Sequence, residues 1–269
     1  MRIIRHQDEA GQICYSAQQS DGVALRIDGE IFGKYEVTNT VSQVVKLLAP
    51  IAPAAIWCIG LNYRRHAEET GIPLPEFPVV FAKGPNSVQN PEDPILVPTR
   101  LKSDEVDYEG ELVVVIGKTC KNVSRQFALD YVFGYCCGND VSARDWQLKK
   151  GGSQWCRGKT FDTFAPLGPC ITTKDEIPNP NNLRLQTILN HEVVQDGNTN
   201  DMIFDVPSLI EFLSGSTTLV PGTLIFTGTP PGVGMAQRPP RWLKPGETVT
   251  VVIETIGALN NPVGVEPAN

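Results

Sequence analysis

The sequence predicts an α+β protein that is mainly β, with a small N-terminal β unit before a larger domain. Many short apolar segments of strand length alternate with turns rich in Gly and Pro. Helical patterns are few and brief, so strands do not alternate regularly with helices. That pattern argues against a doubly wound parallel sheet and favours a mainly β architecture.

The N-terminal unit is predicted from three strand patterns within residues 1–38, each separated from the next by a turn containing glycine. Pro50 and Pro53 then interrupt the chain, and we place a boundary near residue 53. The predicted domains are therefore 1–53 and 54–269. Within the larger domain the main predicted elements are strands at 57–60, 110–116 and 133–140 and helices at 62–70, 142–147 and 206–212.

Composition restricts the class of partner. The formal net charge is -7 over 269 residues, which argues against nucleic acid, because phosphate binding needs a basic surface. The apolar runs have strand length and are too short to span a bilayer, so we expect no membrane partner. Seven scattered cysteines form no zinc-type spacing and, with no apolar leader pattern, favour reduced thiols in the cytoplasm.

Two glutamates lie at the start of the strongest strand pattern, in the segment DYEGELVVVIG (107–117). Side chains alternate along a strand, so Glu109 and Glu111 are predicted to share one face. Two neighbouring carboxylates repel each other unless a cation neutralises them, and Mg²⁺ or Mn²⁺ prefers such oxygen ligands. The alternative is that both glutamates face solvent at the start of the strand.

A second cluster lies in DVSARDWQ (140–147). Asp140 follows a buried strand pattern, a junction where functional residues often lie. Arg144 and Gln147 are three residues apart and share one face of the predicted helix, and Arg can bind a carboxylate through two hydrogen bonds. The alternative assigns Asp140 to a turn and Arg144 to a surface ion pair.

Three further segments carry candidate groups. Lys159 lies between glycine and aromatic residues, where its ammonium would be partly desolvated and could stabilise an enolate. The alternative is an ordinary surface lysine. His66 and Glu69 share one face of a predicted helix. They are either a pair that activates water or an ordinary surface pair. The loop TGTPPGVG (227–234) lacks the Lys of a phosphate loop, so we interpret Thr229 as a carboxylate-binding residue or part of a plain turn.

In this order the segments resemble the fumarylacetoacetate hydrolase superfamily, from about residue 54 onward. The resemblance is carried by six segments, IGLNYRRH (59–66), DYEGELVVVIG (107–117), DVSARDWQ (140–147), GKTFDTFAPLG (158–168), GNTNDMIF (197–204) and TGTPPGVG (227–234). It implies a mixed β-sandwich roll like the C-terminal domain of fumarylacetoacetase, a homodimer, and a bound Mg²⁺ or Mn²⁺.

The resemblance also implies residue roles. Metal ligands would be Glu109, Glu111 and Asp140. Catalytic residues would be His66, Glu69 and Lys159, and substrate-binding residues would be Arg144, Gln147 and Thr229. The founding enzyme has a further acidic ligand where this chain has Asn62, so water would complete the metal's coordination here.

The function expected from these roles is hydrolysis of a C–C bond in an acylpyruvate-type 2,4-dioxo acid, through a pyruvate enolate. The alternative is an oxaloacetate tautomerase or decarboxylase, because the same enolate stabilisation serves both reactions. A metal- or metabolite-binding protein without catalysis is a third hypothesis. In each case the partner is a small anionic 2-oxo acid.

Overall fold

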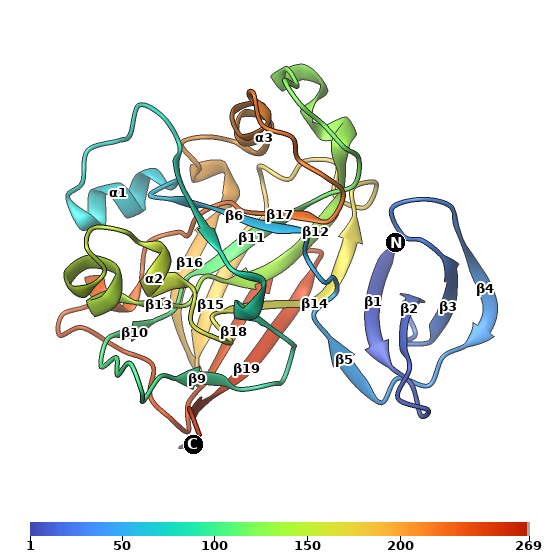
Figure 1. Ribbon diagram of the computed structural model, residues 1–269, viewed down its shortest axis with the longest axis horizontal. Helices are drawn as coiled ribbons and strands as arrows, with labels where there is room; N and C mark the ends of the chain where they lie inside the picture. Colours follow the sequence, from blue (N-terminus) through green and yellow to red (C-terminus); the bar gives the residue numbers. More distant parts are fainter. Residues whose placement is uncertain (268–269) are drawn as a thin grey trace.

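The computed structural model describes residues 1–267 and contains many strands and few helices (Figure 1). The predicted α+β, mainly β class is confirmed. The larger sheet has twelve strands; its main path runs β4-β3-β2-β1-β14-β12-β11-β17-β6-β7, while β5 pairs with β1 and β8 with β14. Its strands are β1 (Arg2–Gln7), β2 (Ile13–Gln18), β3 (Ala24–Gly29), β4 (Tyr35–Val41), β5 (Lys46–Leu48), β6 (Ala55–Gly60), β7 (Val79–Lys83), β8 (Val88–Gln89), β11 (Gly110–Ile116), β12 (Val132–Asn139), β14 (Ala165–Thr173) and β17 (Thr223–Phe226).

A second sheet of five strands covers one face of this sheet, in the order β16-β15-β18-β19-β9. Its strands are β9 (Ile95–Val97), β15 (Arg184–Leu189), β16 (Glu192–Asn198), β18 (Thr248–Ile253) and β19 (Gly257–Val265). A short pair, β10 (Val106–Asp107) and β13 (Ser142–Ala143), lies beside the site described below.

The central strand β11 is buried on both faces, which is in keeping with its unbroken apolar run from Leu112 to Ile116. Leu112 and Val114 face the core shared with the five-stranded sheet. Val113 and Val115 face a second core that includes Phe226 and extends to the N-terminal strands. This double burial fixes the register of β11, and with it the positions of the polar residues at its start.

The helices lie at the margins of the sheets (Figure 1). They are α1 (Arg64–Thr70), α2 (Cys156–Lys159), α3 (Val206–Ser214), a π-helical turn at Asp145–Lys150, and 3-10 turns at Pro85–Ser87, Arg125–Tyr131, Thr199–Asp201 and Gly234–Ala236. The prediction that a helix begins at Ser142 was wrong. Ser142 pairs in β13, and its hydroxyl donates to Asp140 O, so the helical turn begins only at Asp145.

The N-terminal strands β1–β5 lie at one end of the molecule (Figure 1), and β1 pairs antiparallel with β14 of the larger domain. The large sheet is therefore continuous across residue 53, and the division into two domains stays a prediction. No helix in residues 1–267 is long and apolar enough to cross a membrane.

Candidate active site

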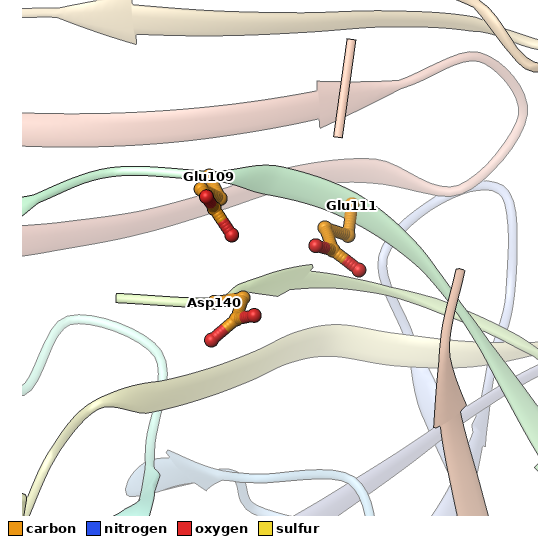
Figure 2. Close-up of side chains that lie close together, drawn as sticks. All are labelled: Glu109, Glu111 and Asp140. Atoms are coloured by element: carbon orange, nitrogen blue, oxygen red, sulfur yellow. The ribbon is translucent and has the colours of Figure 1, made fainter. Parts of the chain in front are cut away.

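Three buried carboxylates gather where β11 begins and β12 ends (Figure 2). Glu109 precedes β11, Glu111 is its second residue, and Asp140 follows β12. One carboxylate oxygen of each lies within 4.8 Å of the others. Two hydrogen bonds hold the strand ends together here. Asp140 N donates to Glu109 O (2.8 Å), and Glu109 N donates to the side-chain Oδ1 of Asn139 (3.0 Å). The predicted common face of Glu109 and Glu111 is confirmed, and the solvent-facing alternative is wrong.

Two buried lysines neutralise part of this charge. Lys159, on α2, places Nζ 2.7 Å from Glu109 Oε2 and 2.8 Å from Asp140 Oδ2. Lys83, at the end of β7, places Nζ 2.7 Å from Asp140 Oδ1. Lys159 is therefore not a surface lysine, and both oxygens of Asp140 face ammonium groups.

The contact between Lys83 and Asp140 is an ion pair without a directed hydrogen bond. Lys83 Nζ donates to three backbone carbonyls, those of Val141, Lys159 and Phe164. Asp140 Oδ1 consequently has no hydrogen-bond donor despite its short distance from Lys83. Lys83 ties together the segments that carry Asp140 and Lys159, while Asp140 Oδ1 keeps lone pairs for another ligand.

Glu111 is the carboxylate with the least compensation. No cation lies within ion-pair distance of it among the described residues, and Gly228 N donates to its Oε2 (2.7 Å). Burial, together with the charges of Asp140 and Glu109, raises the pKa of Glu111 well above its ordinary value. For Glu109, burial acts in the same direction, but Arg144 and Lys159 outweigh it and hold the pKa below its ordinary value.

These residues fit a hard divalent cation. All three side chains offer oxygen, one buried oxygen lacks a donor, and one carboxylate lacks a counter-charge. No other group of three His, Cys, Asp or Glu side chains in residues 1–267 has this geometry. Glu109, Glu111 and Asp140 are the residues that would hold Mg²⁺ or Mn²⁺.

Arg144 connects this site to the loop that follows β17. Its Nη2 donates to Glu109 Oε1 (2.6 Å), its Nη1 to Gln147 Oε1 (3.0 Å), and its Nε to Asp107 Oδ2 (2.8 Å). The predicted neighbourhood of Arg144 and Gln147 is confirmed, whereas the surface ion pair is wrong because Arg144 is buried. Asp107 also accepts from Gly234 N (2.7 Å) and Met235 N (3.0 Å), so one buried carboxylate anchors both Arg144 and the loop.

The loop 227–234 reaches the site because Gly228 adopts a left-handed conformation, with φ 96°. A Cβ at this position would lie 2.7 Å from the Cβ of Asn62. Thr229 lines the cavity, but its hydroxyl donates to Gly110 O (2.9 Å) and accepts from Gln195 Nε2 (2.8 Å). The hydroxyl proton of Thr229 is thus directed at the main chain. The role of Thr229 in binding the substrate carboxylate stays a prediction.

His66 and Glu69 face the same cavity from α1. His66 Nδ1 lies 3.1 Å from Glu69 Oε2, and Glu69 Oε1 accepts from Gly232 N (2.9 Å). The carboxylate is therefore held by the loop while it orients the imidazole. The helix ends at Thr70, the end of the predicted range 62–70, and is capped by Gly71, whose φ is 69°.

The cavity has a volume of about 420 Å³. It brings together eight of the nine predicted site residues, Glu109, Glu111, Lys159, Arg144, Gln147, Thr229, His66 and Glu69. The ninth, Asp140, lies beneath Lys159 and belongs to the carboxylate group. Asn62 does not line the cavity, and its side chain instead binds the main chain of Phe204 and Thr227.

Three supporting residues were not predicted, namely Lys83, Asp107 and Gln195. Each is a buried polar side chain that binds main-chain groups distant in sequence. Only Asp107 had a local signal, since it lies two residues before Glu109 in the same segment. The partners of Lys83 and Gln195 depend on tertiary contacts that no spacing reveals.

The chain is similar to known proteins over most of its length. The family model described as fumarylacetoacetate hydrolase, C-terminal, matches residues 55–264. The chain is 51% identical over 227 residues to a Dictyostelium discoideum homolog of fumarylacetoacetate hydrolase domain-containing protein 2, covering 81% of this chain and 74% of the relative. It is 50% identical over 220 residues to the mitochondrial oxaloacetate tautomerase fahd2 of Xenopus laevis, covering 81% of this chain and 68% of the relative.

Solved structures show the same fold over the whole chain. A 5-carboxymethyl-2-hydroxymuconate delta-isomerase from Mycobacterium smegmatis superposes with a TM-score of 0.86 at 37% identity, covering 99% of this chain and 100% of that one. A fumarylacetoacetate hydrolase from Exiguobacterium antarcticum gives a TM-score of 0.87 at 34% identity with the same coverage. The chain belongs to the fumarylacetoacetate hydrolase family.

Proposed function

We propose that this protein is a divalent-metal-dependent enzyme that interconverts the keto and enol forms of oxaloacetate. The observation that carries the proposal is the group of three buried carboxylates with Lys159, of which Glu109, Glu111 and Lys159 line the cavity. It occurs in a chain 50% identical to an oxaloacetate tautomerase. Oxaloacetate tautomerisation, predicted as the alternative to C–C bond hydrolysis, thereby becomes the first candidate.

The metal would be Mg²⁺ or Mn²⁺ held by Glu109, Glu111 and Asp140. When bound, it supplies Lewis acidity that draws electron density from the 2-oxo group and favours the enolate. The ammonium of Lys159 stabilises the negative charge that develops on the enolate oxygen. Gln147 Oε1 accepts from Arg144, which leaves the amide NH₂ of Gln147 as the end available to the substrate carboxylate.

Tautomerisation moves a proton between C3 and the oxygen on C2. Glu69 accepts a hydrogen bond from His66 Nδ1, so Nε2 of the neutral ring carries the free lone pair. In the proposed mechanism His66 Nε2 takes the proton from C3 and passes it to the oxygen on C2, and the same two transfers run in reverse when the enol returns to the keto form. Gly232 N fixes Glu69 and thus keeps the ring in this tautomer.

Hydrolysis of an acylpyruvate is the second candidate function, and the His66–Glu69 pair is the observation that favours it. An imidazole oriented by a carboxylate at the cavity wall can also take a proton from water. Decarboxylation of oxaloacetate would use the same enolate stabilisation. The carboxylates and Lys159 serve all three reactions, so substrate turnover must distinguish them.

The test is a parallel assay of protein loaded with Mg²⁺ or Mn²⁺ on oxaloacetate, acetylpyruvate and fumarylpyruvate, followed by ultraviolet absorbance. We expect rapid keto–enol equilibration of oxaloacetate without cleavage of the two dioxo acids. Cleavage of a dioxo acid that disappears in His66→Ala would support hydrolysis instead. Turnover of none of these compounds would refute catalysis on this substrate class and favour a metabolite-binding protein.

We further propose a homodimer and a cytoplasmic location. The dimer follows from the family resemblance, and light scattering of the purified protein tests it. All seven cysteines are free in the described residues, in keeping with a reducing compartment. The Xenopus relative is named as mitochondrial, so imaging of a tagged chain in its native cell must decide the compartment.

A further inference from the structure

We propose that Arg238 binds the second carboxylate of a dicarboxylic substrate and so selects oxaloacetate over 2-oxo acids that lack one. The inference rests on the function proposed above. It adds the residue that determines which 2-oxo acids the cavity accepts.

Arg238 is the one cavity-lining Lys or Arg of the described chain whose charge has no carboxylate partner. Three Lys or Arg side chains line the cavity, and two of them form ion pairs with carboxylates. Arg144 pairs with Asp107 and Glu109, and Lys159 pairs with Glu109 and Asp140. The Arg238 guanidinium donates only to carbonyl oxygens, those of Ala236 (3.3 Å) and Gln237 (3.0 Å).

The rest of the described cavity lining offers no other unpaired Lys or Arg for a second carboxylate. Glu69, Glu109 and Glu111 also line it and would repel the anion. Much of the remaining wall is apolar, formed by Ile59, Ile72, Pro73, Val79, Leu148 and Trp155. A carboxylate placed against such a surface loses hydration without gaining a partner.

The main chain presents Arg238 at the cavity on a pinned loop. Asp107 binds Gly234 N and Met235 N at the start of the segment, and Arg241 N donates to Gly234 O (2.9 Å), which closes it. Arg238 lies between these contacts with an exposed side chain. Its planar guanidinium matches the two oxygens of a carboxylate, and its exposed position keeps the expected effect moderate.

Binding of ligands that are not turned over tests the inference by calorimetry on Mg²⁺-loaded protein. L-Malate and L-lactate share the same 2-hydroxy acid end, but only malate has a second carboxylate. We expect wild type to prefer malate, and Arg238→Gln to weaken malate binding by about tenfold while lactate binding is unchanged. Arg238→Lys should retain part of the preference. Arg100→Gln is the matched control, because Arg100 is exposed and lies outside the cavity.

Kinetics provide the second measurement, with oxaloacetate compared to its 4-methyl ester. We expect Arg238→Gln to raise KM for oxaloacetate by about tenfold and to leave KM for the ester unchanged. An unchanged malate preference in Arg238→Gln, or equal losses for malate and lactate, would overturn the inference. If wild type turns over neither compound but the malate preference depends on Arg238, the proposed function fails and the carboxylate site stands.

Discussion

At the scale of single residues, the site is a balance of buried charges. Glu109, Asp140 and Asp107 each contact a cation, whereas Glu111 contacts only a main-chain N–H. A buried carboxylate without a counter-charge is costly, and a bound cation removes that cost. Glu111 is therefore the residue on which metal binding should depend most strongly.

Lys159→Met separates enolate stabilisation from metal binding. Loss of a preorganised cation beside the developing charge should lower kcat by about 10²–10³. Metal affinity should not fall, because Glu109 and Asp140 lose a competing ammonium. Steady-state kinetics and Mn²⁺ titration followed by electron paramagnetic resonance measure the two quantities.

Lys149→Met is the matched control, since Lys149 is exposed and pairs with Glu105 outside the cavity. It should leave both quantities unchanged. Unaltered kcat in Lys159→Met would show that this lysine does not act on the enolate.

The candidate residues were predictable from the sequence where they lie in short segments of fixed spacing. Strand alternation is a local property, so Glu109 and Glu111 could be placed on one face. Lys83 and Gln195 could not be predicted, because their partners come from distant segments brought together only by the fold. Arg238 was missed for the same reason, since only the cavity shows that its charge lacks a partner.

At the scale of elements, the loop after β17 connects the carboxylates to α1. Asp107 binds the loop on one side, and Glu69 binds it on the other through Gly232 N. The loop therefore joins the groups that would hold the metal to the imidazole that would move the proton. Its sequence suggested a carboxylate-binding residue or a plain turn, but not that its N–H groups bind the protein's own carboxylates.

Asp107→Asn should weaken this connection. The amide has a single acceptor oxygen and no charge, so Arg144 and the loop N–H groups lose charge-assisted hydrogen bonds worth roughly 2–3 kcal/mol in total. Urea denaturation should show that loss, and KM should rise because the loop lines the cavity.

The exposed Asp162→Asn is the matched control for this variant, and it should change neither quantity. An Asp107→Asn protein with wild-type stability and KM would contradict the role assigned to the loop anchor.

Helix α3 gives a pH-dependent prediction. Asp205 caps the helix by accepting from Ser208 N (3.0 Å). Burial opposes ionisation, but Arg125 and Ser208 outweigh it and lower the pKa of Asp205 below 3.8. A lowered folded-state pKa means that the stabilisation is present above pH 3.8 and is lost as pH falls through the folded value.

Asp205→Ala should therefore cost about 1 kcal/mol at neutral pH. The difference from wild type should shrink as pH falls below 4, because the capping carboxylate then becomes protonated. Urea denaturation at several pH values checks this. A difference that stays constant down to pH 3 would show that the charge of Asp205 does not contribute.

At the scale of the whole molecule, the mainly β class was predictable because strand patterns and turns are local signals. The pairing of β1 with β14 was not, since it joins residues about 170 positions apart by long-range contacts. The protein is acidic overall, with a net charge of -7, yet its cavity collects lysine and arginine side chains around three carboxylates. Local charge at the site, and not net charge, thus determines which ligand it suits.

Metal binding should stabilise the whole fold, because the three carboxylates lie at the adjoining ends of β11 and β12 in the central sheet. At 100 times the dissociation constant, a bound ion adds about 2.7 kcal/mol, which corresponds to a rise in Tm of roughly 5–10 °C. Thermal unfolding with Mg²⁺, Mn²⁺ or EDTA measures this rise in Tm. Glu111→Gln should abolish the rise, and an equal rise in that variant would place the ion elsewhere.

The most direct test of the central claim is the rate of oxaloacetate keto–enol equilibration, followed by enol absorbance with Mg²⁺-loaded wild type, EDTA-treated wild type and Glu111→Gln. The account predicts acceleration by the Mg²⁺-loaded wild type that is lost on EDTA treatment and in Glu111→Gln. Equal acceleration by all three samples, or none by the loaded wild type, would contradict it.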